Sequence, residues 1–550
     1  MRSYAHGASE VELIGRTIGE DLERTASRFP DREALVDVPT GRRWTYAELN
    51  EAVDRVASGL LAVGLRTGDR IGIWSPNCAE WVLVQYATAK LGAILVNINP
   101  AYRSHELRYV LDQSSIRMLV SAASFKSSDY LAMIDEVRGD CRALEVVIVL
   151  GSNDWDAIAT ATAGRDSLAA RASALSVDDA INIQYTSGTT GFPKGATLTH
   201  HNILNNGFFV GLLLGYTEDD RVCVPVPFYH CFGMVMGNLG ATTNGSTIVI
   251  PAPSFDPAAT LQAVQDERCT SLYGVPTMFI SELALPDFGS YDLSSLRTGI
   301  MAGSPCPIEV MKRVVAEMNM DEVTIMYGMT ETSPVSTMTR RDDDLEHRTA
   351  TVGTVMPHVE IQIIDPASGL AVPRGVPGEV CTRGYSVMLG YWDAPAQTEE
   401  AIDAAGWMHT GDLGTMDDDG YVAIVGRIKD MVIRGGENIY PREVEEFLYT
   451  HPDIDDVQVI GVPDEKYGEE LMAWVRPRAG ADALTVEAVR EFCAGRLDRY
   501  KIPRYLHLTD EFPMTVTGKV RKVEMRERSI ELLRGDGGGG AGWHGPDSAT

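Results

Sequence analysis

The stretch 45–91 contains two segments with apolar residues at helical spacing and, between them, a short and mostly apolar run that is typical of a strand. Thr45 and Glu48 form a capping-box pattern, after which apolar residues recur at helical spacing. The mostly apolar run 70–74 predicts a buried strand, and a second helical stretch follows at 79–91. Strands that alternate with helices in this way predict an α/β fold whose sheets are covered by helices.

Length and composition limit the classes of protein to which the chain can belong. A chain of 550 residues is too long for one hydrophobic core, so we expect several domains. A hydrophobic fraction of 44% and a charged fraction of 23% are typical of folded globular proteins. The formal net charge of −29 disfavours nucleic acid as a partner, because clustered Lys and Arg bind a phosphate backbone. An anionic substrate must therefore meet local positive groups.

The sequence has neither the features of a secretory signal nor an apolar run long enough to span a bilayer. We therefore predict a cytoplasmic protein and leave peripheral membrane contact open. The eight cysteines include no C-x-x-C pair, which favours reduced thiols over a disulfide framework or a zinc site. Monomer and homodimer both remain open as oligomeric states.

A second, compact pattern follows residue 430 and predicts a separate small α+β domain. Its elements are a helix after Pro441, strands near Val457–Val462, Leu471–Arg476 and Tyr505–Leu508, and a helix near Val486–Leu497. A charged Arg-Ile-Lys-Asp segment precedes it and marks the boundary. The predicted parts are a large multi-sheet α/β domain at 1–426, a hinge at 427–430, a mobile C-terminal α+β domain at 431–534 and a flexible Gly-rich tail at 535–550.

A loop rich in glycine and hydroxyl side chains lies between the apolar stretch 180–183 and an expected strand at 196–198. Glycines let a backbone approach a polyphosphate closely, while N–H groups, hydroxyls and a lysine stabilise its charge. The residues predicted to bind ATP phosphates are Thr186, Ser187, Gly188, Thr189, Thr190, Gly191 and Lys194. The alternative is a surface turn, which the hydroxyl density and the lysine disfavour. Lys194 is followed by Gly195 rather than by Ser or Thr, so the loop is not a Walker P-loop.

This loop resembles the signature loop of the adenylate-forming superfamily, which includes acyl-CoA synthetases, luciferase-like enzymes and the adenylation domains of peptide synthetases. Further segments resemble the same superfamily in the expected order: Pro227–Gly233, Ala302–Pro305, Tyr327–Thr332, His409–Leu413, Gly426–Asp430 continuing to Gly435–Asn438, and Pro513–Lys519. The resemblance covers nearly the whole chain. It implies a large domain that binds AMP and the acyl group, and a small mobile domain that carries a catalytic lysine.

The resemblance also implies how ATP and magnesium are held. Tyr327 is similar to the aromatic residue that packs on adenine, and Asp412 to the carboxylate that accepts hydrogen bonds from the ribose. Arg427 resembles the arginine beside the ribose and phosphate. Glu331 resembles the carboxylate that holds Mg²⁺, since a hard cation prefers oxygen ligands. The remaining residues implied at the nucleotide are Gly303, Ser304, Gly328 and Met329, and Thr330 beside Glu331 is implied as a catalytic residue.

Two half-reactions place different demands on such a site. Attack of a carboxylate on the α-phosphate of ATP brings two anions together, and the resemblance assigns Lys519 to bridge them. Transfer to coenzyme A then needs a path for a long pantetheine arm, and the resemblance implies that the small domain rotates to supply it. Lys429 matches the pivot region, and Gly435, Gly436 and Glu437 match the segment along that path. His230 is expected near the acyl end of the site, with a structural histidine as the alternative.

The predicted reaction converts a carboxylic acid, ATP and coenzyme A into acyl-CoA, AMP and pyrophosphate. Apolar and small residues dominate the segments expected around the acid, at 228–238, 299–303 and 327–336. Gly328 stands where acetate-specific relatives carry a tryptophan. We therefore predict medium- to long-chain fatty acids as substrates.

Other functions fit the same motifs less well. An acyl-AMP ligase would deliver the acyl group to a carrier protein, and Gly435-Gly436 favours coenzyme A without excluding it. Luciferase-like oxidation is a further option. Amino-acid adenylation is disfavoured because the segment 227–233 has no aspartate for a substrate ammonium group. A non-catalytic nucleotide-binding protein would be expected to have lost Lys519, Glu331 or the phosphate loop, and the sequence keeps all three.

Overall fold

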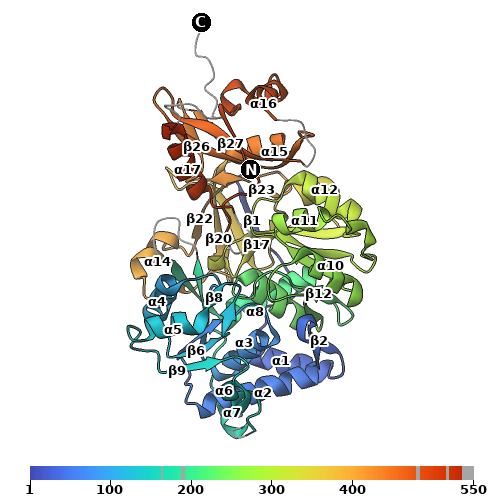
Figure 1. Ribbon diagram of the computed structural model, residues 1–550, viewed down its shortest axis with the longest axis vertical. Coiled ribbons are helices and arrows are strands. Elements are labelled where there is room, and N and C mark those ends of the chain that lie inside the picture. Colours follow the sequence, from blue (N-terminus) through green and yellow to red (C-terminus); the bar gives the residue numbers. More distant parts are fainter. Residues whose placement is uncertain (163–164, 187–192, 436, 479–483, 516–519, 536–550) are drawn as a thin grey trace.

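The computed structural model describes residues 1–162, 165–186, 193–435, 437–478, 484–515 and 520–535. Among these residues, the larger sheets form two groups along the long axis of the molecule (Figure 1). The sheets built from strands before residue 428 make up the larger part. A sheet built from strands after residue 431 lies at one end, with the C-terminal helices around it. This arrangement confirms the predicted α/β fold with a C-terminal α+β unit.

A seven-stranded sheet carries the borders of the predicted phosphate loop. Its order is β21 (Gly390–Tyr391), β11 (Lys194–Thr199), β10 (Ala180–Thr186), β5 (Ile94–Asn97), β4 (Arg70–Trp74), β6 (Met118–Ser121) and β9 (Val146–Val149). The strands from β10 to β9 run parallel, and every residue of β5 is buried, as expected for a sheet with both faces covered. The antiparallel hairpin of β10 and β11 pairs Thr186 with Lys194. The two ends of the phosphate loop therefore leave one edge of this sheet.

A nine-stranded sheet is parallel from β16 to β2 and antiparallel at both ends. Its order is β18 (Thr354–Val355), β17 (Val335–Met338), β16 (Glu322–Gly328), β15 (Thr298–Ala302), β14 (Ser271–Gly274), β12 (Arg221–Cys223), β13 (Thr247–Ile250), β2 (Glu33–Asp37) and β3 (Arg42–Thr45). In parallel sheets, ligands bind outside the carboxyl ends of the strands. The carboxyl ends of β15 and β16 carry Gly303 and Tyr327 to the same edge.

A five-stranded antiparallel sheet of the larger part contains the last strand before the C-terminal part. Its order is β1 (Tyr4–His6), β19 (Val359–Ile364), β20 (Gly378–Gly384), β22 (Met408–Met416) and β23 (Val422–Arg427). The register of β22 and β23 places Asp412 opposite Arg427. Two residues that are 15 positions apart in sequence are thereby fixed side by side.

The C-terminal sheet has the order β25 (Glu437–Ile439), β24 (Val432–Arg434), β27 (Gly468–Pro477) and β26 (Ile454–Asp464), with β28 (Tyr505–Leu508) parallel to β27. Its predicted strands are confirmed, although β26 and β27 are longer than the predicted segments. The predicted helix 486–497 is too long, because α16 (Val486–Cys493) ends four residues earlier. Gly495 turns the chain there with φ +72°, and Leu497 still packs against the domain core from the following turn.

Helices cover these sheets and connect their strands. The α-helices before the C-terminal part are α1 (Ile18–Arg28), α2 (Tyr46–Ala62), α3 (Ala79–Leu91), α4 (Ser104–Gln113), α5 (Tyr130–Arg138), α6 (Asn153–Ala159), α7 (Arg165–Ala172), α8 (His200–Leu213), α9 (Gly240–Thr242), α10 (Pro257–Asp266), α11 (Pro276–Leu283), α12 (Ile308–Glu317), α13 (Leu345–Ala350) and α14 (Pro395–Ala401). The C-terminal part adds α15 (Pro441–Leu448), α16 and α17 (Lys522–Gly535). None of the helices in the described parts of the chain is long and apolar enough to cross a membrane.

Short elements complete the fold. They are the π-helix η2 (Phe232–Leu239), the 3-10 helices η1 (Val38–Thr40), η3 (Phe288–Ser290), η4 (Thr330–Thr332) and η5 (Arg499–Lys501), and the hairpin of β7 (Ser124–Phe125) with β8 (Ser128–Asp129). Helix α17 extends to Gly535, one residue into the predicted tail, and the rest of that tail lies outside the described residues.

The local predictions for the stretch 45–91 are confirmed. Thr45 and Glu48 form the capping box that starts α2, with the Thr45 N–H donating to Glu48 Oε2 at 2.9 Å. The strand β4 and the helix α3 have the predicted bounds. These elements depend on signals within a few residues of each other, which is why the sequence alone identifies them.

The buried His200 predicts a loss of stability in acid. Its Nδ1 accepts from the Ile18 N–H at 3.2 Å, which joins α1 to α8, and burial lowers its pKa from 6.5 to about 4. The unfolded chain takes up a proton between these pH values and the folded chain does not, so stability is full above pH 6.5 and falls as the pH drops towards 4. The loss amounts to about 3 kcal/mol. The thermal midpoint of the wild type should therefore fall more steeply with decreasing pH than that of His200→Gln. The control variant His201→Gln should follow the wild type. An equal dependence of the thermal midpoint on pH in all three proteins would contradict this prediction.

Candidate functional site

Tyr327, Asp412 and Arg427 meet at the border between the two parts of the molecule. The Tyr327 hydroxyl donates to Asp412 Oδ2 at 2.9 Å, and Arg427 Nε donates to Asp412 Oδ1 at 3.1 Å. Asp412 is buried, whereas Arg427 is exposed over 57% of its side chain. The structure therefore brings together the three residues that sequence reasoning assigned to adenine, ribose and phosphate.

The charge of Asp412 dominates the electrostatics of this group. This charge is the largest cause that raises the pKa of the Arg427 guanidinium. The pKa of Tyr327 is raised well above 10, first by burial of the phenol and second by the charge of Asp412. Tyr327 therefore stays a neutral hydrogen-bond donor at physiological pH. Hydrogen bonds also hold the backbone next to Asp412 and Arg427. The Asp412 N–H donates to Thr410 Oγ1, and the Ile428 N–H donates to the Gly411 carbonyl oxygen.

The ends of the predicted phosphate loop lie at the edge of the seven-stranded sheet. Thr186 ends β10, Lys194 starts β11, and the Thr186 hydroxyl donates to the Lys194 carbonyl at 3.4 Å. The predicted phosphate-binding residues Ser187, Gly188, Thr189, Thr190 and Gly191 lie outside the described residues. The predicted loop position between two strands is confirmed for its borders.

Glu331 is buried in η4, four residues beyond Tyr327. The Tyr391 hydroxyl donates to Glu331 Oε1 at 2.8 Å, and the Glu331 carbonyl accepts from the Met388 N–H. Burial and the charge of Glu331 raise the pKa of Tyr391, so this phenol remains a donor. One oxygen of the predicted magnesium ligand is therefore fixed by a neighbouring strand.

Tyr391 is a site residue that sequence reasoning missed. Besides its hydrogen bond to Glu331, its ring lies under the ammonium group of Lys194, 4.9 Å from the ring centroid. The pairing of β21 with β11, which places Tyr391 opposite Ala196, causes this arrangement. No local pattern signals it, because the two strands are almost two hundred residues apart in sequence.

The other residues predicted at the nucleotide surround Tyr327 and Glu331. Gly303 takes φ +90° immediately after β15, and a Cβ at Gly328 would lie 1.8 Å from the Pro334 carbonyl oxygen. Glycine is therefore required at Gly328 by the backbone that passes over it. Met329 precedes η4, the predicted catalytic Thr330 is its first residue, and Ser304 follows Gly303 at the same sheet edge.

His230 lies in a turn next to β10. Its Nδ1 accepts from the Phe232 N–H at 3.1 Å, and the adjoining Cys231 thiol donates to Gln184 Oε1 at 3.0 Å. Gln184 is two residues before Thr186, so the turn is fastened to the strand that leads into the phosphate loop. The backbone contact orients the imidazole ring, and its role in catalysis stays a prediction.

The predicted hinge forms a turn after β23, in which the Asp430 and Met431 N–H groups donate to the Arg427 carbonyl. Lys429 lies in this turn. The predicted pantetheine-path residues Gly435 and Glu437 are exposed, Gly435 between β24 and β25 and Glu437 at the start of β25. Gly436 and Lys519 lie outside the described residues. Helix α15 reaches the large part of the molecule, because Arg442 donates to the Cys306 carbonyl at 3.3 Å.

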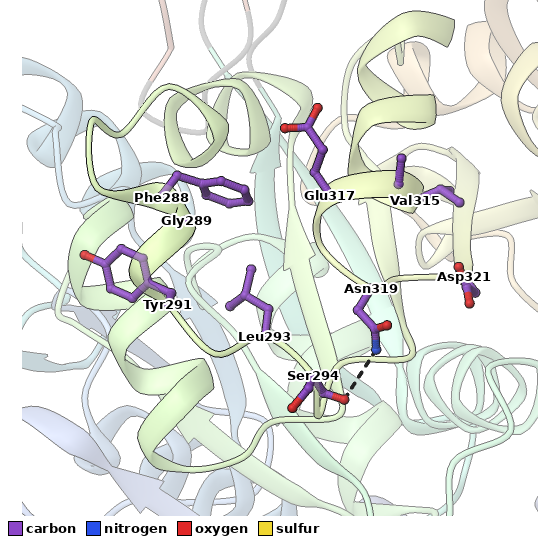
Figure 2. Close-up of a pocket in the computed structure, with 10 residues that line it drawn as sticks. Phe288, Gly289, Tyr291, Leu293, Ser294, Val315, Glu317, Asn319 and Asp321 are labelled. Atoms are coloured by element: carbon purple, nitrogen blue, oxygen red, sulfur yellow. Dashed lines mark hydrogen bonds between the residues drawn. The ribbon is translucent and has the colours of Figure 1, made fainter.

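A surface hollow of about 570 Å³ lies away from these residues. Figure 2 shows Phe288, Tyr291 and Leu293 on one side of it and Glu317 and Asp321 on the other. Its lining residues come from η3, from the end of α12 and from the segments next to them, and none of the described residues predicted at the site is among them.

Comparison with known proteins identifies the family. The model of the AMP-binding enzyme family matches residues 22–392, and that of the AMP-binding enzyme C-terminal domain matches residues 443–519. YngI of Bacillus subtilis (strain 168), an acyl-CoA synthetase by name, is 47% identical over 95% of this chain and 99% of its own length. The medium-chain acyl-CoA ligase ACSF2 of Danio rerio, a mitochondrial protein, is 44% identical over 96% of this chain and 91% of its own length.

A solved structure agrees with these sequences. The anthranilate CoA ligase AuaEII in complex with anthranoyl-AMP superposes with a TM-score of 0.85 and 26% identity, over 96% of this chain and 99% of that chain. The fold, the motifs and the relatives point to one reaction class. The chain therefore belongs to the AMP-binding enzyme family, as an AMP-forming acid–CoA ligase of its acyl-CoA synthetase branch.

Proposed function

We propose that this ligase activates medium- to long-chain fatty acids. The name of the Danio rerio relative supports a medium-chain acid, and apolar and small residues dominate the segments expected around the acyl chain. The π-helix η2 and the strand β15 are buried throughout, and apart from Asn238 their side chains are aliphatic, aromatic, thioether or small. Such a lining suits a hydrocarbon chain better than a charged or hydroxylated acid.

The observation that carries the proposal is the Tyr327–Asp412–Arg427 group beside the Glu331–Tyr391 pair. Asp412 accepts from the Tyr327 hydroxyl at Oδ2 and from Arg427 Nε at Oδ1, and a carboxylate of this kind can also accept from ribose hydroxyls. Arg427 supplies a fixed positive charge near the phosphates. We assign the ring of Tyr327 to adenine, and Lys194 with Thr186 to the phosphates.

Glu331 is suited to hold Mg²⁺ together with the ATP phosphates. Its carboxylate is buried, and the Tyr391 hydroxyl donates to Glu331 Oε1, which fixes the orientation of the side chain. Magnesium bound there would neutralise phosphate charge, which is the contribution that this ion makes to adenylate formation. Lys519 is proposed to orient the acid carboxylate against the α-phosphate.

The proposed division into domains follows from the same reaction. We place the ATP and acyl site in residues 1–426, the hinge at 427–430 and the mobile domain at 431–534. The contact of Arg442 with the segment after Ser304 supports a small domain that closes over the nucleotide. Rotation about the hinge would withdraw Lys519 and bring Gly435 and Gly436 to the thiol path.

Cellular location and assembly are further parts of the proposal. We propose a cytoplasmic enzyme, although the Danio rerio relative is named as mitochondrial. Both a monomer and a homodimer are compatible with the site, since all of its assigned residues come from one chain.

The proposal is tested by measuring AMP and acyl-CoA with ATP, Mg²⁺ and saturated acids of graded chain length, with and without coenzyme A. We expect the highest kcat/KM for medium to long chains and formation of the thioester. An adenylate that ignores coenzyme A would instead indicate delivery to a carrier protein. A preference for acetate or for aromatic acids would contradict the fatty-acid proposal.

Tyr391→Phe should raise the Mg²⁺ concentration needed for half-maximal adenylate formation. The change keeps the ring under Lys194 but removes the hydrogen bond that holds Glu331. Loss of a partner that orients a metal ligand typically weakens metal binding by about 10–100-fold, and we expect about tenfold here. ATP–pyrophosphate exchange against Mg²⁺ concentration measures it.

A matched control for this change is Tyr421→Phe. The Tyr421 hydroxyl also donates to a carboxylate, Asp343 Oδ1 at 2.7 Å, and Tyr421 precedes the start of β23, whereas Arg427 ends that strand. It should leave the Mg²⁺ dependence unchanged. An unchanged dependence in Tyr391→Phe as well would show that Tyr391 does not position Glu331.

A further inference from the structure

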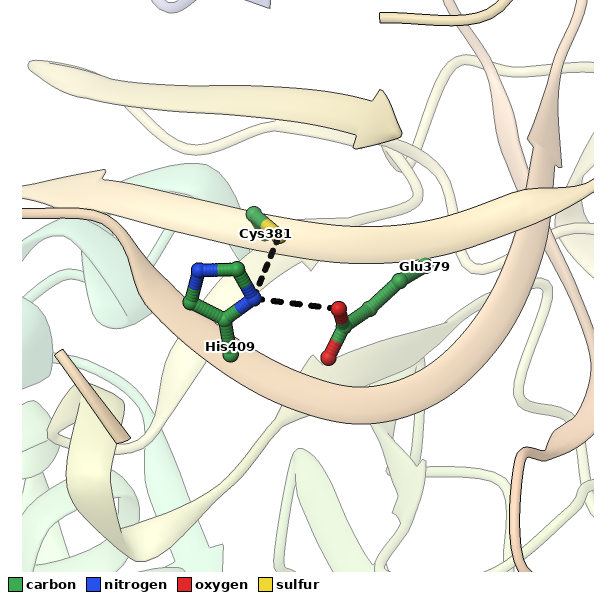
Figure 3. A group of neighbouring side chains, drawn as sticks. All are labelled: Glu379, Cys381 and His409. Atoms are coloured by element: carbon green, nitrogen blue, oxygen red, sulfur yellow. Dashed lines mark hydrogen bonds and ion pairs between the residues drawn. The ribbon is translucent and has the colours of Figure 1, made fainter. Parts of the chain in front are cut away.

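Three potential metal ligands converge between β20 and β22. His409 Nδ1 lies 3.0 Å from Glu379 Oε2 and 3.7 Å from Cys381 Sγ, and the three ligand atoms all lie within 4.8 Å of one another. Figure 3 shows one nitrogen of the imidazole ring directed at both the thiol and the carboxylate. Glu379 and Cys381 are buried, and His409 is partly exposed.

The outer atoms of these side chains have partners of their own. Glu379 Oε1 accepts from the Gly411 N–H at 3.1 Å, which leaves Oε2 directed at the cluster. His409 Nε2 lies 3.9 Å from Asp403 Oδ2, so a proton on Nε2 would face a carboxylate and leave Nδ1 free of one. Metal-binding histidines commonly have a carboxylate at their second nitrogen in this way.

The kinds and spacing of the ligand atoms select the cation. Imidazole nitrogen, thiolate sulfur and carboxylate oxygen together suit Zn²⁺, whereas Mg²⁺ prefers oxygen alone. Tetrahedral zinc with bonds of about 2.0–2.3 Å places its ligand atoms roughly 3.3–3.7 Å apart. The distances of His409 to its two neighbours are close to this range without a change of backbone.

We propose that Glu379, Cys381 and His409 form a Zn²⁺ site, with water as the fourth ligand on the exposed side of His409. Cys381 binds as the thiolate and gives its proton to solvent. Ile364 and Trp407 pack with Cys381 and exclude water from the sulfur. The ion ties β20 to β22 three residues before Asp412, and it is distinct from the Mg²⁺ proposed at Glu331.

The position of the site predicts a stabilising ion. Zn²⁺ that binds the folded chain and not the unfolded chain raises the thermal midpoint by mass action. The site also gives a role to His409, the first residue of the segment 409–413, which has no assigned role in the proposed ATP site. Because Asp412 belongs to the same strand, the ion would hold the strand segment that carries the proposed ribose ligand.

The direct test uses Co²⁺ as a spectroscopic probe of the full-length protein after dialysis against a chelator. We expect one Co²⁺ per chain, with a thiolate-to-cobalt charge-transfer band in the near ultraviolet that Zn²⁺ abolishes and excess Mg²⁺ does not. Absence of this band in the wild type would overturn the proposal. The readout does not depend on ligase activity, so it separates this site from the proposed substrate.

Variants then assign the ligands. Cys381→Ser and His409→Asn should lose the band, while Cys78→Ser should keep it because Cys78 is not in the cluster. Asp403→Asn should bind Zn²⁺ about 10–100-fold more weakly without loss of the band. Circular dichroism checks that each variant is folded. A band that persists in Cys381→Ser would show that another thiol binds the ion, and would also overturn the proposal.

Discussion

Lys519→Ala should reduce adenylate formation by about 10²–10³-fold, comparable to the loss of one preorganised donor at a developing charge. The same variant should still transfer the acyl group from a supplied acyl-adenylate to coenzyme A. The reason is that only the first half-reaction brings the acid carboxylate and the ATP phosphate together as two anions. ATP–pyrophosphate exchange measures the first step, and thioester formation from synthetic acyl-adenylate measures the second.

Lys312→Ala is the control for the Lys519 variant. Lys312 is an exposed lysine of α12 whose ammonium group pairs with Glu309 at 2.8 Å, so its removal should change neither step. Equal loss of both steps in Lys519→Ala would remove the assignment of this lysine to adenylation alone. It would then favour a role for Lys519 in binding a group that both half-reactions share.

Asp412→Asn should raise KM for ATP by about 10–100-fold. An asparagine has the shape of the aspartate but only one oxygen, so it cannot accept from both Tyr327 and Arg427 while also accepting from a ribose hydroxyl. Hydrogen bonds to charged groups contribute about 1.5–3 kcal/mol, which corresponds to this range of affinity. Initial rates at varied ATP concentration and saturating fatty acid measure the effect.

The control for this variant is Asp418→Asn, an exposed residue in the turn between β22 and β23. It removes the same charge a short distance along the chain and should leave KM for ATP unchanged. A rise in KM that is equal in the two variants would attribute the effect to general electrostatics. An unchanged KM in Asp412→Asn would contradict the assignment of this carboxylate to the ribose.

The sequence alone determined the local elements and the class of chemistry. The capping box at Thr45 and Glu48, the strand β4 and the helix α3 depend on residues within one or two turns of each other. The glycine- and hydroxyl-rich loop likewise carries its own chemical meaning, because nearly all the groups that bind phosphate lie within one short segment. The helix α16 was predicted too long because apolar spacing continues past the turn at Gly495.

Only the tertiary structure decided which distant side chains act together. Tyr391 reaches Glu331 because β21 pairs with β11, and Tyr327 reaches Asp412 across two different sheets. The cysteine spacing gave no reason to expect a zinc site, yet the pairing of β20 with β22 places Cys381 beside His409. Strand order is set by the packing of the whole chain, whereas sequence patterns report only the neighbours of each residue. The residue types for catalysis can thus be identified from the sequence, but the pairs that orient them depend on the sheets.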